Sequence, residues 1–290
     1  MSYASAEAYA VRAALVVHRV TTDRGETLAA IAELAHAAAD DGASLILFSE
    51  TALTGFVATG DPAHDLPLGE PLPGPATDRL AAVARERRVW LGFGLYERER
   101  ARPGYPGGAD ECAAGYSSTA ADNADRLYDA AVLLGPDGAV RLHYRRITPQ
   151  WHWPTDDPAI YRQGTGLPAV ATPFGTCAFL LCGDLFSDGL VERVRALRAD
   201  LLLVPFARRF DSEVADAADW ERRERYDYAR RAREAGAAAL MVSYLADSPA
   251  LGGCFGGALA VARDGMVLAS LPPGREGALV VDLERSRCAS

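Results

Sequence analysis

Short runs of apolar residues alternate along the chain with segments in which apolar residues recur at helical spacing. In the first half, apolar runs predict strands at residues 13–17, 44–48, 89–94 and 130–134, and residues 139–144 are predicted as the return strand of a hairpin. The periodic segments at 27–39 and 77–87 predict helices, and Gly42 ends the first of them. Strands that are apolar without alternation are typical of a sheet whose two faces are both covered.

The second half of the chain repeats this order. Strands are predicted at residues 178–182, 201–205, 238–244, 256–262 and 266–270, and helices at 190–198 and 220–235. Turn residues at 135–138 and 263–265 connect neighbouring strands as hairpins, so antiparallel pairs join the parallel ones. We therefore expect an α/β fold with two mixed sheets, in one domain that covers residues 1–290.

Residues 100–125 interrupt this alternation. They are rich in Gly, Ala, Ser, Pro and Asp and show no period. The segment predicts a long loop insertion, which is either a lid or a tolerated surface segment.

The composition excludes several classes of protein. A net charge of −9 argues against a general surface for nucleic acids or anionic membranes, and no apolar run approaches the ~20 residues of a spanning helix. The N-terminal residues lack the layout of a signal peptide. The five cysteines are dispersed without CxxC spacing, so they predict neither a disulfide framework nor a metal site. We expect a cytoplasmic protein.

All 30 basic residues are arginine, and the sequence contains no lysine. Genomic base composition is the simplest explanation. The consequence for chemistry is independent of the cause, because no reaction step of this protein can use a lysine side chain of its own.

Two residues at predicted strand ends suggest covalent catalysis. Cys182 ends one strand and is followed directly by Gly183, a junction that exposes a thiol with a backbone N–H beside it. Glu50 stands at the carboxyl end of another buried strand, where open α/β sheets place their sites and where partial desolvation favours a general base. Taken singly, each has a simpler explanation, as a buried structural cysteine and as a carboxylate that caps a turn.

The segments around these residues resemble the nitrilase superfamily of carbon–nitrogen hydrolases, from residue 13 to about residue 271. Residues 43–56 resemble the glutamate motif of that family, with Ser49 where proline is usual. Residues 181–186 resemble the nucleophile motif and continue as the family does through residues 199–205. Residues 128–131 and the turn at 135–138 resemble the hairpin before the lysine motif, and residues 255–258 resemble the late glycine motif.

The resemblance implies a four-layer α-β-β-α sandwich and acyl chemistry without a cofactor. It also implies a triad with Glu50 as the general base and Cys182 as the nucleophile, and the Gly183 N–H would help to hold the oxyanion. Arg146 occupies the position of the family's lysine. Its guanidinium is planar, larger and never deprotonated in this pH range, so it either stabilises the oxyanion or pairs with Glu50 and holds it away from the thiol.

Four further residues are candidates for substrate contacts. Trp151, close after Arg146, would line a pocket or pack at a subunit face. Asp157 lies with Asp156 where several amidases of the family carry a second glutamate, and a solvated loop acid is the alternative. Phe186 ends the nucleophile motif, and Phe206 follows the strand at 201–205, where the family often contacts substrate.

These residues together favour an enzyme that cleaves a non-peptide carbon–nitrogen bond of a small molecule, in an amide rather than a nitrile, through a cysteine thioester. Two alternatives stay open. One is a catalytically impaired binding subunit that has lost the lysine, and the other is an acyl-transferring or C–N ligating enzyme in which an amine resolves the thioester. Because the family commonly pairs through its sandwich faces, the resemblance also implies a homodimer or a larger homo-oligomer.

Overall fold

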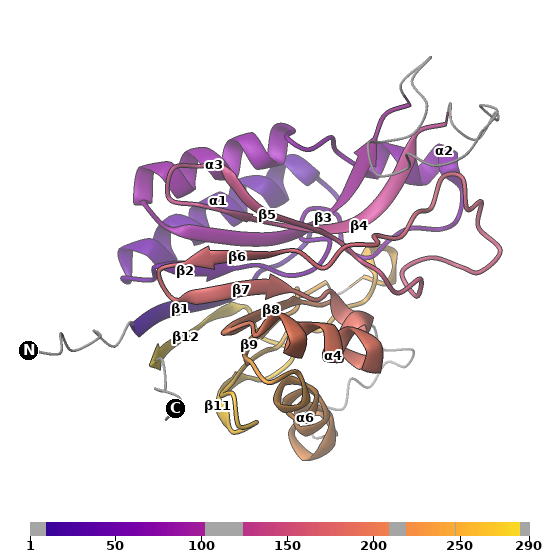
Figure 1. Cartoon of the computed structure of the whole chain (residues 1–290). Coiled ribbons are helices and arrows are strands. Elements are labelled where there is room, and N and C mark those ends of the chain that lie inside the picture. The colour runs from indigo at the N-terminus through magenta and orange to yellow at the C-terminus, as the bar shows by residue number, and fades with distance from the viewer. Residues whose placement is uncertain (1–9, 102–123, 209–218, 247, 285–290) are drawn as a thin grey trace, which may run out of the picture.

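Two six-stranded sheets stack face to face in the computed structural model, which describes residues 10–101, 124–208, 219–246 and 248–284 (Figure 1). The first sheet has the strand order β12-β1-β2-β3-β4-β5. Its strands are β1 (Ala10–Val17), β2 (Leu45–Leu47), β3 (Trp90–Glu99), β4 (Arg126–Leu134), β5 (Val140–Arg145) and β12 (Gly277–Glu284). Strands β1, β2 and β3 are parallel, and the outer pairs are antiparallel.

The second sheet has the order β11-β10-β9-β8-β7-β6. Its strands are β6 (Ala169–Thr172), β7 (Gly175–Phe179), β8 (Leu201–Pro205), β9 (Ala238–Val242), β10 (Ala258–Val261) and β11 (Val267–Leu271). Strands β7, β8 and β9 are parallel, and antiparallel strands again flank them. Both sheets are therefore mixed, as the repeated order of elements predicts.

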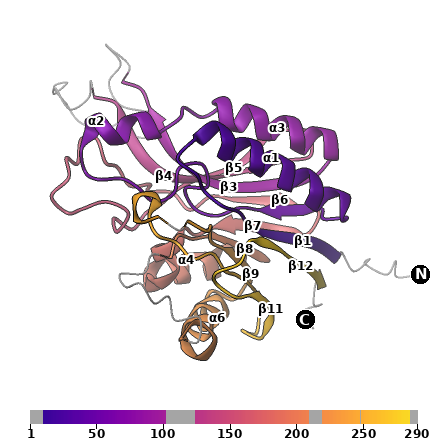
Figure 2. The same cartoon turned by 180° about the vertical axis from the view of Figure 1, so that it is seen from behind.

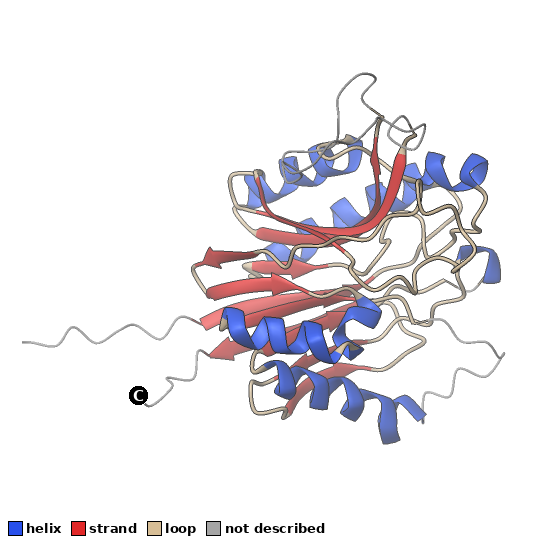
Figure 3. Ribbon diagram, turned by 45° about the vertical axis from the view of Figure 1, so that its right-hand side comes forward, coloured by secondary structure: helices blue, strands red, loops and turns tan. Residues whose placement is uncertain are grey.

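Helices cover the outer face of each sheet, and this gives the four layers α-β-β-α (Figures 2 and 3). Helices α1 (Arg24–Asp40) and α3 (Pro75–Arg87) lie on the first sheet, and α4 (Asp188–Leu197) and α6 (Arg225–Ala235) lie on the second. Shorter pieces are α2 (Pro62–Asp65), the 3₁₀ turns η1 (Leu66–Leu68), η3 (Cys182–Phe186) and η5 (Pro249–Leu251), and the π-helical turn η4 (Trp220–Glu224).

The largest apolar core lies between the sheets and continues under α4 and α6. Leu15, Leu47 and Leu133 of the first sheet belong to the same buried cluster as Phe179 and Leu203 of the second. A separate cluster fills the space between the first sheet and its two helices. Since both faces of the central strands are buried, their sequences are continuous apolar runs.

The predicted boundaries need corrections. Strand β7 ends at Phe179 rather than at Cys182, which begins η3 instead. Strands β6 and β12 were not predicted, because their residues are largely half-buried or exposed and lack a long apolar run. The four-residue helix α2 is too short for a periodic signal. Most of the loop predicted at 100–125 lies outside the described residues.

Candidate active site

Strand ends from both sheets bring Glu50, Arg146 and Cys182 together. Glu50 follows β2 and Arg146 follows β5 in the first sheet, whereas Cys182 follows β7 in the second. Glu50 is 0% exposed and Arg146 is 2% exposed, and Cys182 is partly buried. The site therefore lies where the two sheets meet, with polar groups from each.

The turn that carries Glu50 passes very close to β3. Hydrogen bonds from Phe48 N to Gly92 O (2.8 Å) and from Gly94 N to Ser49 O (2.9 Å) hold it there. A Cβ at position 94 would meet the Glu50 Cα at 2.6 Å, so this approach requires glycine. The next residue, Thr51, has φ = 43°, a left-handed conformation that is unfavourable for a β-branched residue. Strain of this kind gathers at functional sites.

Burial dominates the electrostatics of Glu50. It raises the pKa of this carboxyl to about 8, with a further rise from Cys182, and Arg146 opposes the rise only in part. A carboxyl with its pKa near neutrality exchanges protons readily at physiological pH, as a general base must. The pKa of Asp129, which is also 0% exposed, is raised by burial and then by the charge of Glu50.

Backbone pairing places Arg146 beside Asp129. Arg146 N donates to Asp129 O at 2.8 Å, which extends the pairing of β5 with β4 by one residue. The Arg146 Nη1 then donates to Glu50 Oε1 at 2.9 Å and to Asp129 Oδ2 at 3.3 Å. Burial alone would lower the pKa of Arg146, but Glu50, Cys182 and Asp129 raise it overall, so the guanidinium stays charged.

The second terminal nitrogen of Arg146 faces the turn of the cysteine. A Cβ built on Gly183 would meet Arg146 Nη2 at 2.6 Å, so only glycine leaves room for this contact. The guanidinium therefore pairs with Glu50, which is one of the two alternatives that the sequence left open. One nitrogen pairs with Glu50, and the other lies against the residue that follows Cys182.

The turn of Cys182 is strained and firmly anchored. Cys182 has φ = 43° and begins η3. Two residues further on, the fully buried Asp184 accepts hydrogen bonds from Thr148 N (2.7 Å), Ile147 N (3.4 Å) and Tyr144 OH (2.5 Å). These bonds tie the cysteine turn to the segment around Arg146. Asp184 and Tyr144 are positioning groups that the motifs contained but that sequence reasoning assigned no role.

Comparison with known proteins shows the family of the chain. The family model described as carbon–nitrogen hydrolase matches residues 12–290. The chain belongs to the carbon–nitrogen hydrolase family. The resemblance to the nitrilase superfamily drawn from the motifs is thereby confirmed, and so is the predicted sandwich of two mixed sheets.

Two curated relatives of this carbon–nitrogen hydrolase are the deaminated glutathione amidases of Mus musculus and Homo sapiens. Each is 28% identical over 207 residues, which is 69% of this chain. The match spans 57% of the mouse protein and 56% of the human protein, so this chain covers little more than half of either relative.

Solved structures share the fold at lower identity. An amidase from Nesterenkonia sp. has a TM-score of 0.68 at 23% identity, covering 95% of this chain and 90% of that one. A carbon–nitrogen hydrolase from Helicobacter pylori G27 has a TM-score of 0.74 at 18% identity, covering 94% of this chain and 88% of that one.

Two of the predicted contact residues of this carbon–nitrogen hydrolase lie in an aromatic cluster of the second sheet. Phe206 follows β8 and stacks on Trp220, with ring centroids 6.1 Å apart. Phe186, at the end of η3, is 45% exposed and meets Tyr228 edge-on at 5.0 Å. Electrostatic interaction with Cys182 contributes, after burial, to the raised pKa of Tyr228, so this cluster borders the cysteine.

Trp151 and Asp157 lie apart from the cysteine turn. Trp151 is fully buried against Tyr96 and Tyr161 of its own chain rather than exposed for packing at a subunit face, and its Nε1 has no hydrogen-bond partner among the described residues. Asp157 is exposed, and its Oδ1 accepts from Ala159 N at 2.9 Å within a turn. Among the described residues, neither side chain is hydrogen-bonded to Glu50, Arg146 or Cys182.

The part of the chain that the structure describes shows neither a cluster of metal ligands nor a membrane-spanning helix. No group of three or more His, Cys, Asp or Glu side chains in that part is arranged to hold a metal ion. None of its helices combines the length and apolar character needed to span a bilayer.

Proposed function

We propose that this carbon–nitrogen hydrolase cleaves a small, non-peptide amide through a thioester on Cys182, with Glu50 as general base and Arg146 as the cation of the site. The observation that carries the proposal is the convergence of these three residues. Arg146 contacts Glu50 through Nη1 and the Gly183 backbone through Nη2, so the base, the cation and the nucleophile turn are linked through one side chain.

In the first half of the reaction, Cys182 Sγ attacks the amide carbonyl carbon and Glu50 accepts the thiol proton. Negative charge develops on the carbonyl oxygen, beside the Gly183 N–H and the Arg146 guanidinium. The C–N bond then breaks, Glu50 returns its proton to the leaving nitrogen, and ammonia or an amine departs. In the second half, water attacks the thioester, Glu50 takes a proton from the water, and the acid leaves as the thiol is restored.

Two observations favour an amide over other carbon–nitrogen substrates. The curated relatives are amidases by name, and the Nesterenkonia amidase is a neighbour in fold. A variant of that amidase shows covalent addition of the acetamide moiety of fluoroacetamide at its active-site cysteine. Fluoroacetamide is therefore a suitable probe for Cys182 here.

The test combines ammonia release from a panel of small primary amides with intact-mass analysis after fluoroacetamide treatment. The wild-type protein is expected to release ammonia and to gain one acetamide adduct, and Cys182→Ala is expected to lose both. Cys177→Ala is the matched control, because Cys177 is buried in β7 and burial raises its pKa to about 12. An adduct that persists in Cys182→Ala, or a wild-type protein inert to every amide and to the probe, would contradict the proposal.

A further inference from the structure

Two buried carboxyl groups share one guanidinium nitrogen in the site. Glu50 and Asp129 are both 0% exposed, and Arg146 Nη1 donates to one oxygen of each, at 2.9 Å and 3.3 Å. If both carboxyls were ionised, two negative charges would face one positive charge in a desolvated space. An unbalanced buried charge of this kind is costly, and a proton retained on one carboxyl removes it.

The remaining oxygens identify where that proton lies. Glu50 Oε2 and Asp129 Oδ1 are buried, and neither accepts a hydrogen bond from a donor of the protein. Two ionised carboxylates cannot hydrogen-bond to each other, since neither has a donor, but a carboxyl and a carboxylate can. Arg146 Nη1 lies closer to Glu50 Oε1, at 2.9 Å, than to Asp129 Oδ2, at 3.3 Å, so the guanidinium favours the ionised form of Glu50 and leaves the proton on Asp129. The interaction between the two carboxyls acts in the same direction, since it raises the pKa of Asp129 and lowers that of Glu50, although burial is the largest cause of the rise in both pKa values. Asp129 is therefore the donor and Glu50 the acceptor.

We propose that Asp129 keeps its proton when Glu50 is ionised and donates it to Glu50, so that Asp129 is a positioning residue for the base. The inference rests on the proposed role of Glu50. During acylation the thiol proton passes from Cys182 to Glu50, and the Asp129 proton stays where it is. Before this transfer, the ionised Glu50 is held between two donors, Arg146 and Asp129, and its charge is balanced by the guanidinium alone.

Other titratable groups around the pair do not supply this proton. Asp184 has three donors of its own. Tyr96, on β3, has a pKa raised well above its ordinary value by burial and by Asp129, so it stays neutral. Several neighbouring groups shift the pKa of Glu50 or Asp129, or have their own pKa shifted by one of them. They include Arg146, Cys182, Asp184, Tyr96 and Tyr228.

Infrared spectroscopy tests the protonation directly, because a protonated carboxyl and a carboxylate absorb at separate frequencies. On the alkaline side of the Glu50 pKa, the wild-type protein is expected to retain a protonated-carboxyl band that Asp129→Asn lacks. In Glu50→Gln this band is expected to titrate at lower pH, because the charge of Glu50 helps to hold the proton on Asp129. Asp65→Asn is the control and leaves the band unchanged, since the pKa of the buried Asp65 is lowered.

A pH profile of Cys182 alkylation tests the positioning role. Asparagine can still donate to Glu50, so Asp129→Asn is expected to keep the onset of alkylation within about half a pH unit of wild type. Asp129→Ala removes the donor that lowers the pKa of Glu50. The pH at which alkylation of Cys182 begins is therefore expected to rise by about one unit, so that at any fixed pH below this onset the variant is alkylated roughly tenfold more slowly than wild type.

The outcomes separate this inference from the proposed function. An alkaline band that survives in Asp129→Asn, or an alkylation profile that is the same in Asp129→Ala and wild type, overturns the inference even if amides are hydrolysed. Neither measurement requires turnover, so the inference also stands or fails when no amide substrate is found. Thermal unfolding of each variant verifies that the compared proteins are folded.

Discussion

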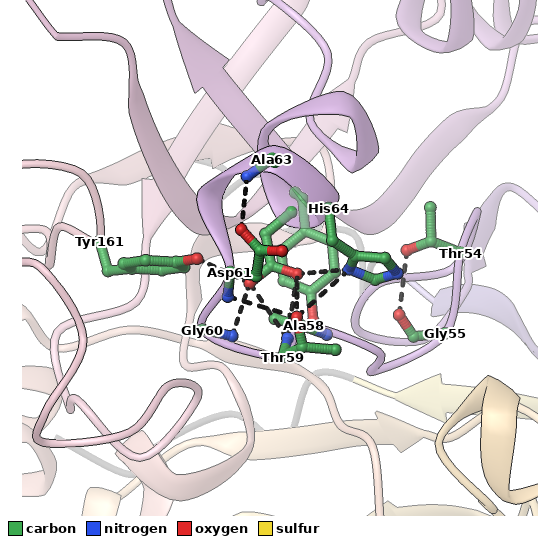
Figure 4. Close-up of polar contacts among 11 residues, drawn as sticks. Thr54, Gly55, Ala58, Thr59, Gly60, Asp61, Ala63, His64 and Tyr161 are labelled. Atoms are coloured by element: carbon green, nitrogen blue, oxygen red, sulfur yellow. Dashed lines mark hydrogen bonds and ion pairs between the residues drawn. The ribbon is translucent and has the colours of Figure 1, made fainter.

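Two clusters around buried carboxyl groups shift the pKa of these groups in opposite directions, down for Asp65 and up for Glu50 and Asp129. Asp65 is 0% exposed, like Glu50 and Asp129. It accepts hydrogen bonds from Thr59 N (3.0 Å), Gly60 N (2.8 Å) and Tyr161 OH (2.7 Å), and His64 Nδ1 lies at 2.6 Å. Figure 4 shows Thr59, Gly60, His64 and Tyr161 gathered in one network of polar contacts.

The two clusters differ in the number of donors and in depth, since Asp65 lies nearer to the protein surface and has more donors. Burial raises the pKa of Asp65, but hydrogen bonds, led by that from His64, outweigh it and leave the pKa below its ordinary value. Glu50 and Asp129 share one nitrogen of Arg146, and among the described residues each has an oxygen that no group other than the partner carboxyl can reach with a proton. A carboxylate that is saturated with donors is fixed in one charge state and holds structure together, whereas one with few donors can exchange a proton.

The largest effect is expected on catalytic activity when Glu50 is replaced. Glu50→Gln removes the base, and we expect kcat/KM for the amide substrate to fall about 10²- to 10⁴-fold, the usual range for a general base. The melting temperature should not fall, because a buried ionisable group with few donors has been replaced by a neutral one. Steady-state ammonia release and thermal unfolding measure the two quantities.

Glu97→Gln is the control for this loss. Glu97 is also buried, but its carboxylate is paired with Arg145 and His143, and the pKa of Glu97 is lowered. Its substitution should leave kcat/KM within a few-fold of wild type, as judged per folded molecule. If both variants lose activity equally, the distinction between a reactive and a structural carboxyl fails.

Removal of the Asp65 carboxyl should act on stability instead. Asp65→Ala leaves Thr59 N, the half-buried Gly60 N and the buried Tyr161 OH without this acceptor, and we expect the free energy of unfolding to fall by about 3 kcal/mol. Asp61→Ala is the matched control. Asp61 caps α2 by accepting from Ala63 N at 2.9 Å but is exposed, so its loss should cost about 1 kcal/mol or less. Equal urea midpoints for the two variants would refute this assignment.

The two clusters should also give stability opposite dependences on pH. Folding raises the pKa of Glu50 from 4.5 to about 8. The contribution of Glu50 to the free energy of unfolding is therefore present at low pH and is lost as the pH rises from about 4.5 to about 8. The pKa of Asp65 is lowered from 3.8, so its contribution is present above that value and is lost as the pH falls.

Urea unfolding at a series of pH values measures this contrast. Between about pH 5 and pH 8, the wild-type protein should lose on the order of 2 kcal/mol relative to Glu50→Gln. Below about pH 4, Asp65→Asn should lose less stability than wild type. Parallel curves for wild type and Glu50→Gln would show that the Glu50 pKa is not raised by folding.

The smallest expected effect comes from exchanging the shared cation. Arg146→Lys keeps the charge, but one ammonium cannot both bridge Glu50 and Asp129 and reach Gly183 as the two terminal nitrogens of the guanidinium do. We expect kcat/KM to fall about tenfold, or about 1.4 kcal/mol, with a smaller effect on folding. A gain of activity would instead indicate that arginine impairs the site.

The sequence by itself determined the class of fold and singled out the candidate reactive groups. Uninterrupted apolar runs such as 201–205 predicted the buried strands, and β8 occupies that range, because burial on both faces leaves no polar position. Cys182 and Glu50 were recognised from local features, a thiol before glycine and a carboxylate after a buried strand. Strand β12 escaped prediction because it is an edge strand whose residues are largely exposed or half-buried.

Only the tertiary structure decided what surrounds each reactive group. Arg146 and Glu50 are 96 positions apart in sequence, and the link between them depends on how β2, β4 and β5 align in the first sheet. The pairing of Asp129 with Glu50 and the contact of Arg146 with Gly183 depend on the same alignment and on the stacking of the second sheet. A pKa depends on burial and on every donor and charge nearby, and a chain's local pattern does not specify which distant residues provide them.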